Sequence, residues 1–325
     1  MSRRAGAPGS GGQPSVYAIG DTTVLGSLAP GIFASGAVAV SVGNYPDGEI
    51  RLDLRERPNE ASVVACSLHD DATGRFSTQR LLWLLATAAA LREHGARRIV
   101  GVAPEIPCLR QDAPTPATYE LSAGHWVKRL LADSALDAMA TVHPKEHVGD
   151  TRKIVGLRYA ELAGALRRHL VAIGAHVDVV LTPDVGARRF GTAVAEELGR
   201  PLATTSKSRI APDEVCIAED FLAAGGGADL TYLVVDDMYV SGATVLSVAR
   251  TLGGAGHSMW AYVSNFRPTC LGLRRLRELK AIPGFNGLLA PHAGERRCDV
   301  EPGDVLRIVS LGTAFERLIL ELVGR

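Results

Sequence analysis

The feature that most constrains the fold of this chain is a regular alternation of apolar, β-branched runs with helical patterns, which continues from one end to the other. Parallel strands need a crossover between them, and that crossover is usually a helix. The alternation therefore predicts an α/β protein in which mainly parallel sheets are flanked by helices. At 325 residues the chain is longer than one hydrophobic core usually serves, so we expect two such halves.

Strands and helices alternate in both halves. In the first half we predict strands at residues 37–42, 62–68, 98–103 and 138–143, and helices at residues 78–94 and 121–132. In the second half we predict strands at residues 177–182, 202–205, 231–236, 259–264 and 305–310, and helices at residues 160–173, 187–198, 243–253 and 313–322. Apolar residues recur every three to four positions in the helices, as is typical of a helix packed on a sheet.

The boundary between the halves is predicted near residues 151–156, where the first run of strands is complete and a new helix begins. We therefore expect an N-terminal domain at residues 16–153 and a C-terminal domain at residues 154–325. The last helix is a candidate to pack across the boundary. Residues 1–15 are rich in Gly, Pro and Ser, which predicts a disordered tail.

Composition excludes several classes of protein. The 35 basic residues balance 35 acidic ones, so nothing suggests a nucleic-acid-binding surface. The five cysteines are scattered without metal-ligand spacing, which favours a reducing cytoplasm. The longest apolar stretch, residues 81–91, is about half the length that a bilayer requires, so we expect no membrane segment.

The strongest functional signal is an apolar strand that ends in two acids, Asp236 and Asp237, and continues through a small, hydroxyl-rich turn into a helix. The turn consists of Ser241, Gly242, Ala243 and Thr244. Small side chains and a helix N-terminus present backbone N–H groups to a phosphate, and the acids would face ribose hydroxyls directly or through Mg²⁺. A strand that simply ends in an Asx-type cap is the alternative. The paired acids favour a sugar-phosphate site.

This segment resembles the sugar-phosphate loop of the phosphoribosyltransferase family, which has two acids, a few variable residues and then Thr/Ser-Gly-Gly-Thr. Together with five further segments in the same order, it resembles the PRPP synthetases, also called ribose-phosphate pyrophosphokinases, from about residue 16 to the C-terminus. The resemblance implies two phosphoribosyltransferase-like domains, with ATP on the first and the pentose phosphate on the second. It implies Mg-dependent transfer of a diphosphoryl group from ATP to the C1 hydroxyl of ribose 5-phosphate, giving PRPP and AMP.

The first resembling segment is Tyr45-Pro-Asp-Gly-Glu-Ile, which in isolation would be an ordinary β-turn. In the family the corresponding segment helps to hold adenine, often from a neighbouring subunit. The resemblance implies that Tyr45 stacks on the base and that Asp47 and Glu49 accept its amino hydrogens. A binding site completed across an interface makes a homo-oligomer the expected assembly.

Two more segments follow predicted strands of the first half. Arg110, Gln111 and Asp112 resemble the Arg-Gln-Asp segment that binds ATP in the family, although a charged surface loop is the alternative. His143 stands where the family has a histidine that ligates Mg²⁺ and contacts the ATP phosphates, and His147 is a weaker candidate for that work.

The second half contains two further segments. Asp184, in Thr-Pro-Asp-Val-Gly, resembles a family residue that binds Mg²⁺ or a ribose hydroxyl, and a helix N-cap is its alternative role. Lys207 and Arg209 stand in the place of a mobile basic catalytic loop. Cations delivered there would stabilise the charge that spreads over phosphate oxygens in the transition state.

The chain also departs from the family pattern. Val240 replaces an acid in the sugar-phosphate loop, and Ala243 replaces a glycine. Thr141 and Val142 replace Asp-Leu before the histidine, and residues 113–119 lack the basic residues of the phosphate-activated class. Phosphate activation is therefore not expected, and a different pentose phosphate stays open.

Three other functions stay open as well: a phosphoribosyltransferase that uses PRPP, a catalytically weak regulatory subunit, and a PRPP-sensing nucleic-acid-binding protein. The first would not need the ATP-like half of the chain. The second should tolerate loss of the basic pair, which this chain keeps. The third would need an added basic module, and the neutral net charge offers none.

Overall fold

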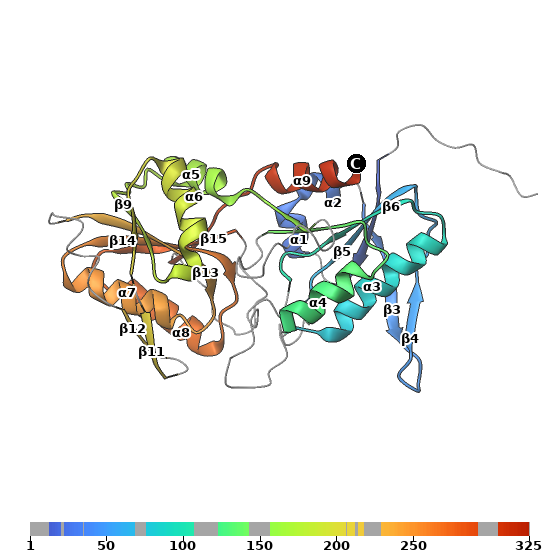
Figure 1. The fold of residues 1–325 in the computed structure, drawn as a ribbon, viewed down its shortest axis with the longest axis horizontal. Coiled ribbons are helices and arrows are strands. Elements are labelled where there is room, and N and C mark those ends of the chain that lie inside the picture. The colour runs from blue at the N-terminus through green and yellow to red at the C-terminus, as the bar shows by residue number, and fades with distance from the viewer. Residues whose placement is uncertain are drawn as a thin grey trace, which may run out of the picture.

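The computed structural model describes residues 13–20, 23–34, 36–68, 76–106, 123–142, 157–205, 207–211, 214–217, 229–291 and 305–324. Within these ranges the chain forms two six-stranded sheets, in which every pair of neighbouring strands is parallel. Each sheet has helices on both faces (Figure 1). Two separate β-hairpins complete the described structure.

The first sheet is built from short, apolar strands of the first half. Its strands, in spatial order, are β2 (Val38–Ala39), β1 (Ser15–Ile19), β5 (Ala61–Cys66), β6 (Arg98–Val102), β7 (Ala138–Thr141) and β8 (Leu157–Tyr159). One face packs against α3 (Thr78–Glu93) and α4 (Ala123–Ala132). The other face packs against α1 (Thr23–Leu28) and α2 (Pro30–Phe33). The Ser77 side chain caps α3 by accepting from the Arg80 N–H, which fixes where that helix begins.

The second sheet has the same construction. Its strands, in spatial order, are β10 (Leu202–Thr204), β9 (Val179–Thr182), β13 (Thr231–Tyr239), β14 (Ser258–Phe266), β15 (Phe285–Ala290) and β16 (Leu306–Ile308). Its helices are α5 (Leu162–Ala172), α6 (Arg188–Leu198), α7 (Ala243–Gly254) and α8 (Cys270–Lys280). Alternate residues of β13 enter different cores: Leu233 and Val235 face α5 and α6, whereas Tyr232 and Val234 face α7 and α8.

The two halves share a core. One hydrophobic cluster joins Val63 of β5 to Val235 of β13. The closing helix α9 (Ala314–Val323) follows the second sheet in sequence but contacts β5, β6, β7 and β8 of the first (Figure 1). Its Phe315 is fully buried, and Arg98 Nε donates to the Leu322 carbonyl at 2.8 Å.

The main elements follow the alternation in the sequence, with three corrections. Ser15 is not part of a tail, because the apolar run that it begins forms β1 in the middle of the first sheet. The predicted strand at residues 37–42 is two strands, β2 in the sheet and β3 (Ser41–Asn44), which pairs with β4 (Ile50–Asp53) in a hairpin. Residues 207–211, predicted as a loop, form β11, which pairs with β12 (Glu214–Ile217). A division of the chain by sheets would fall after β8, and the boundary at 153/154 stays a prediction.

Sequence reasoning missed several elements, notably the strands β1 and β15 and the 11-residue helix α8. Among the described residues, no helix combines the length and the apolar character that a membrane span requires.

Candidate functional site

The carboxyl ends of the second sheet's strands meet at one edge, because every pairing in that sheet is parallel. β9 lies between β10 and β13, so these three strands end side by side. Asp184 follows β9, and Asp236 and Asp237 lie in the last part of β13. Ligands of open α/β sheets bind at this edge, which makes it the candidate site.

The acid pair is held in place by its own backbone and by β14. Asp236 is only 4% exposed, and its Oδ1 accepts from the Asp237 N–H at 2.8 Å. The Asp237 carbonyl accepts from Ser264 Oγ and from Asn265 Nδ2, both at 3.0 Å. These contacts fix the end of β13, while the Asp237 side chain stays partly exposed at the edge.

The turn after the acids is shaped around Tyr239. Burial raises the pKa of the Tyr239 hydroxyl above its usual range, so it stays protonated and donates to the Gly272 carbonyl at 2.9 Å. Gly242 has φ +73°, and a Cβ at that position would overlap Tyr239 Oη. Only glycine both adopts this positive φ readily and has no Cβ to overlap the tyrosine. Gly242 is the N-cap of α7, so the first N–H groups of that 12-residue helix point out of the turn without a capping side chain.

Three successive carbonyls at the entry to the turn, from residue 239 to residue 241, are held by α8 and by the segment that leads into it. The Arg267 N–H donates to the Tyr239 carbonyl at 2.8 Å, and the Thr269 N–H donates to the Val240 carbonyl at 3.0 Å. Arg275 Nη1 donates to the Ser241 carbonyl at 3.2 Å. Sequence reasoning missed these supporting residues. The only local signal was Thr269, whose side chain caps α8 by accepting from the Gly272 N–H at 3.1 Å.

Asp184 lies at the start of the 3-10 turn Val185–Ala187, where its Oδ1 accepts from the Ala187 N–H at 3.1 Å. The N-cap role that the sequence offered as an alternative is therefore present. The same side chain is half-buried at the edge where β13 also ends. A capping carboxylate has a second oxygen, so this role is compatible with ligand binding.

Lys207 and Arg209 lie in β11, and their side chains are outside the described part of the structure. β11 begins shortly after β10 ends, and the Thr205 N–H donates to the Thr182 carbonyl of β9 at 3.0 Å. Its partner strand β12 packs against α7. The basic segment therefore starts from the same edge of the sheet as the acid pair, as the first strand of a hairpin.

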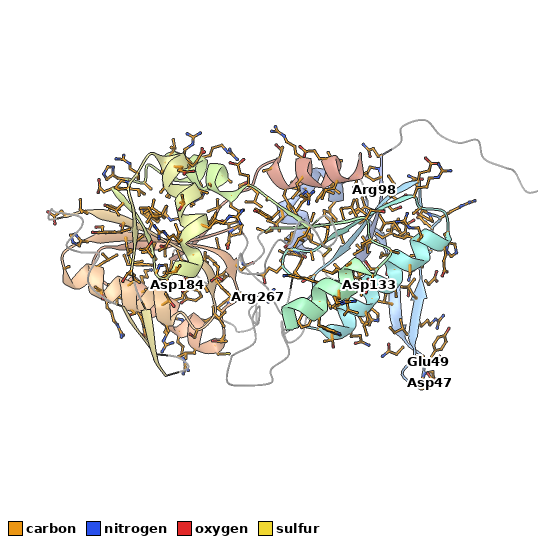
Figure 2. The ribbon with its side chains drawn as sticks, in the orientation of Figure 1. Asp47, Glu49, Arg98, Asp133, Asp184 and Arg267 are labelled. Carbon is orange, nitrogen blue, oxygen red and sulfur yellow. The ribbon has the colours of Figure 1, made fainter. Side chains whose placement is uncertain are left out.

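The predicted adenine-binding residues lie far from this edge. Tyr45, Asp47 and Glu49 form the tip of the β3–β4 hairpin, which projects from the other half (Figure 2). The Tyr45 N–H donates to the Glu49 carbonyl at 2.8 Å, and Asp47 Oδ1 accepts from the Glu49 N–H at 3.1 Å. The turn conformation that the sequence alone would suggest is thus present, with Tyr45 50% exposed.

Five of the predicted residues are outside the described residues: Arg110, Gln111, Asp112, His143 and His147. Thr141 and Val142, which precede His143, are described at the end of β7. Among the described residues, no three His, Cys, Asp or Glu side chains gather as a metal-binding group.

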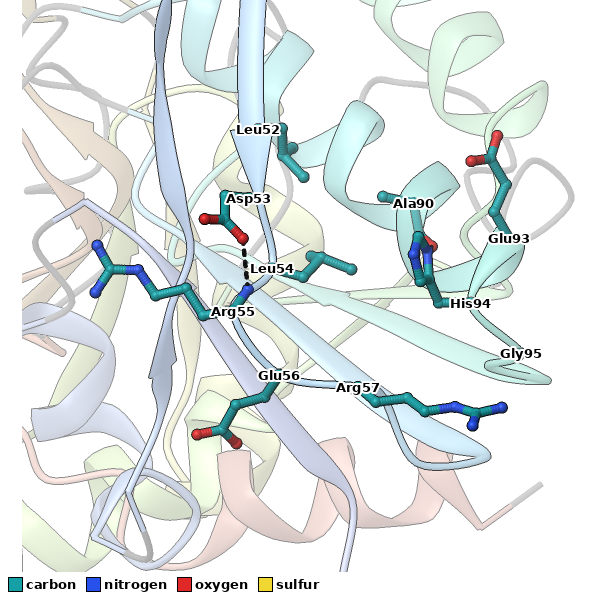
Figure 3. Close-up of a pocket in the computed structure, with 10 residues that line it drawn as sticks. All are labelled: Leu52, Asp53, Leu54, Arg55, Glu56, Arg57, Ala90, Glu93, His94 and Gly95. Carbon is teal, nitrogen blue, oxygen red and sulfur yellow. Dashed lines mark hydrogen bonds between the residues drawn. The ribbon is translucent and has the colours of Figure 1, made fainter. Parts of the chain in front are cut away.

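A separate hollow of about 760 Å³ lies between the chain after β4 and the end of α3 (Figure 3). Arg55, Arg57 and His94 line it together with Asp53 and Glu93. Its charges are mixed, and none of the site residues predicted from the sequence is among the described residues that line it.

The fold and the edge of the second sheet define the class of protein. A family model described as the phosphoribosyl transferase domain matches residues 152–271, which include Asp184, the acid pair and the turn after it. The crystal structure of phosphoribosylpyrophosphate synthetase from Mycobacterium smegmatis superimposes with a TM-score of 0.72 at 19% identity, over 95% of this chain and 98% of that one. The chain is thus an α/β protein with two phosphoribosyltransferase-like halves, and the predicted fold class is confirmed.

Curated relatives show a similarity in sequence as well as in fold. A ribose-phosphate pyrophosphokinase of Bradyrhizobium diazoefficiens is 27% identical over 230 residues, covering 69% of this chain and 69% of the relative. One of Thermococcus kodakarensis is 28% identical over 218 residues, covering 67% and 73%. The sequence is thus similar to those of ribose-phosphate pyrophosphokinases over about two thirds of the chain, which agrees with the resemblance of its motifs.

Proposed function

We propose that this chain is a ribose-phosphate diphosphokinase, which transfers the diphosphoryl group of ATP to the C1 hydroxyl of ribose 5-phosphate and releases AMP. The observation that supports this function best is the segment at residues 241–244, which follows a pair of acids and contains the N-cap and the first two residues of α7. The names of the curated relatives point to the same reaction.

The pentose phosphate would bind at this turn. Ser241 and Thr244 supply hydroxyl donors, and the first N–H groups of α7 add main-chain donors together with the positive end of the helix dipole. Asp236 and Asp237 would face the ribose hydroxyls, since carboxylates accept hydrogen bonds from them. Ala243 stands where the family's sugar-phosphate loop pattern has glycine. Its methyl group would narrow the space beside the phosphate and could thereby change which pentose phosphate is accepted.

ATP would bind to the first half and to the basic segment. Arg110, Gln111 and Asp112 continue from β6, and Lys207 and Arg209 would serve the transferring group. The anomeric hydroxyl would attack the β-phosphorus in line, with the bond from that phosphorus to the α-phosphate oxygen breaking as AMP leaves. Positioning and charge neutralisation would supply most of the acceleration, since no covalent intermediate on the enzyme is needed.

The proposed Mg²⁺ ligands are Asp184 and His143. Asp184 is a hard oxygen donor at the carboxyl edge of the second sheet, and Mg²⁺ is usually held by one or two protein side chains together with substrate phosphates. The ion would neutralise charge on the phosphate oxygens.

The proposed assembly is a homo-oligomer, in which Tyr45, Asp47 and Glu49 serve the site of a neighbouring subunit. The position of the hairpin tip supports this assignment, since Tyr45 is 50% exposed and therefore available to another chain. We also propose that the halves are domains that meet at residues 153/154, and that the protein is cytoplasmic, because its five cysteines are scattered without disulfide or metal-ligand spacing.

The test is a product assay with purified protein, Mg²⁺, ATP and, in separate reactions, ribose 5-phosphate, arabinose 5-phosphate and xylose 5-phosphate. We expect AMP and a phosphorylated sugar diphosphate in equal amounts with ribose 5-phosphate. Preference for another sugar would support the alternative of a different pentose. If no sugar yields AMP, the diphosphokinase assignment is wrong and the regulatory subunit becomes the better explanation. Pyrophosphate release from PRPP plus adenine would instead identify a phosphoribosyltransferase.

A further inference from the structure

Glu105 and Arg267 join the two halves through a shielded ion pair. Glu105 lies just after β6 of the first sheet, and Arg267 lies just after β14 of the second. Arg267 Nε contacts Glu105 Oε2, and Figure 2 shows Arg267 between the two halves. The exposed fraction of the Glu105 side chain is 6% and that of Arg267 is 26%, so water screens this pair far less than an exposed one.

The backbone around Glu105 is anchored at the carboxyl edge of the first sheet. The carbonyl of the preceding residue, Pro104, accepts from Thr141 Oγ1 at 3.0 Å and from the Val142 N–H at 3.1 Å. The segments proposed to bind the nucleotide continue from the two strand ends that meet here. Glu105 therefore has a fixed position relative to the start of both segments.

Arg267 is anchored to the proposed pentose-phosphate turn. Its N–H donates to the Tyr239 carbonyl, and the hydrogen bonds from Thr269 and Arg275 hold the next two carbonyls of the turn. A single residue thus contacts the turn through its main chain and Glu105 of the other half through its side chain. Each end of this connection is fixed by hydrogen bonds within its own sheet.

We propose that Glu105 and Arg267 are positioning residues, which align the pentose-phosphate turn of the second half with the nucleotide segments of the first. The proposal rests on the proposed function, but neither residue is assigned a contact with substrate. Two substrates held on different sheets react only when their reacting atoms are aligned, and a misplacement of about 1 Å can cost about 100-fold in rate. An ion pair that spans the gap restricts the relative movement of the two edges.

The test compares the double variant Glu105→Gln/Arg267→Met with a matched control. Neutralising both partners together avoids leaving one shielded charge uncompensated, which is the change most apt to prevent folding. The control is Arg167→Met/Glu197→Gln, which removes an Arg–Glu pair of 2.7 Å between α5 and α6 within the second half. Arg267→Lys, which keeps the charge but not the planar fork, provides an intermediate variant.

For the double variant we expect kcat to fall about 100-fold, while ribose 5-phosphate alone and a non-hydrolysable ATP analogue alone bind within about threefold of wild type. Arg267→Lys should recover part of the loss, and the control pair should leave kcat unchanged. If kcat stays within about threefold of wild type, or if it falls only as much as binding of one substrate weakens, the positioning role is wrong.

Hydrogen exchange separates this proposal from the proposed function. The double variant should exchange the amides of residues 239–244 about tenfold faster than wild type, because the turn loses its tether to the first half. This readout requires no turnover. If wild type forms no AMP but the exchange rates of the double variant change as expected, the proposed function is wrong, whereas the link between the halves through Glu105 and Arg267 is supported. If the exchange rates of these amides are unchanged, the connection itself is disproved.

Discussion

Gly242 has the tightest conformational requirement in the proposed phosphate-binding turn. Its φ of +73° disfavours any residue with a side chain, and Tyr239 Oη occupies the place of a Cβ. We expect Gly242→Ala to lower the free energy of unfolding by about 2 kcal/mol and to weaken ribose 5-phosphate binding at least about tenfold. Urea unfolding and calorimetric titration measure the two effects.

Gly254, at the other end of α7, is the matched control. A Cβ at Gly254 meets nothing within 4 Å, so Gly254→Ala should leave sugar-phosphate binding unchanged and change stability by less than about 1 kcal/mol. Wild-type affinity for ribose 5-phosphate in folded Gly242→Ala would remove this turn from the binding site.

Lys207 is the residue on which the proposed chemistry depends most. A cation close to the transferring group stabilises charge that develops only in the transition state, so its loss lowers kcat more than it raises KM. We expect Lys207→Ala to reduce kcat by about 100-fold to 1000-fold, with the KM values for both substrates changed by less than about threefold. Steady-state kinetics measure the effects on kcat and on KM separately. The highly exposed Arg97 is the control, and Arg97→Ala should keep wild-type kcat.

The acid pair and the turn were predictable at the residue scale because their residue types are adjacent in sequence. The residues that hold the turn were not, since Arg267, Thr269 and Arg275 act mainly through hydrogen bonds to backbone carbonyls about 30 positions away. Every residue has a backbone carbonyl, so the residue types do not indicate which carbonyl accepts such a hydrogen bond. The contact of Arg267 with Glu105 likewise joins two residues with no shared local pattern.

At the scale of elements, Asp178 ties together the starts of β9 and β13. Its Oδ2 accepts from the Thr231 N–H at 2.9 Å, and its Oδ1 lies 2.7 Å from His176 Nε2. The hydrogen bond from the Thr231 backbone lowers the pKa of Asp178 below its usual value of 3.8. The carboxylate therefore adds stability that is complete above pH 3.8 and is lost as the pH falls below that value, through the folded-state pKa.

Asp178→Asn keeps an oxygen that can accept from Thr231 but removes the titrating group. We expect the variant to lose less stability than wild type as the pH is lowered below 3.8, although it is less stable at pH 7. Urea unfolding at a series of pH values measures the slope of the free energy of unfolding against pH. Asp133→Asn, an exposed substitution near the end of α4, should keep the wild-type slope. Equal slopes in Asp178→Asn and wild type would mean that this carboxyl does not contribute to the pH dependence of stability.

The longer elements were predicted well because their patterns are long enough to recognise. β13 and β14 each contain an apolar run of four or five residues, and α7 and α9 have regular apolar faces. β8 has only three residues, and Gly287 interrupts the apolar run of β15, so neither gave a clear signal. β11 was expected to be a loop because a short polar strand resembles one until its partner is known.

At the scale of the whole molecule, the two halves were predictable from the repeated alternation, but their connection was not. The shared hydrophobic cluster and the return of α9 to the first sheet depend on contacts between residues that are far apart in sequence. The position of the β3–β4 hairpin is also a property of the whole molecule. Figure 2 shows its tip, with Asp47 and Glu49, on the opposite half of the molecule from Asp184.

That separation predicts that the hairpin serves another subunit, which a mixing experiment can test. Tyr45→Ala should remove the contact of the hairpin with adenine, and Lys207→Ala should remove the cation that acts on the transferring group. In a mixed homo-oligomer, a hairpin from a Lys207→Ala chain can complete the site of a Tyr45→Ala chain. If the subunits are mixed at random in equal amounts, roughly a quarter of the sites combine two intact contributions.

We therefore expect the two inactive proteins, unfolded together and refolded as a mixture, to recover roughly a quarter of the wild-type rate. Each variant refolded alone is the control and should stay inactive. A hairpin that served its own chain would give no recovery, because every chain in the mixture then has one damaged contribution to its own site. Recovery would thus require a contact between subunits, whereas its absence in refolded, oligomeric protein would place Tyr45 in its own chain's site or outside any site.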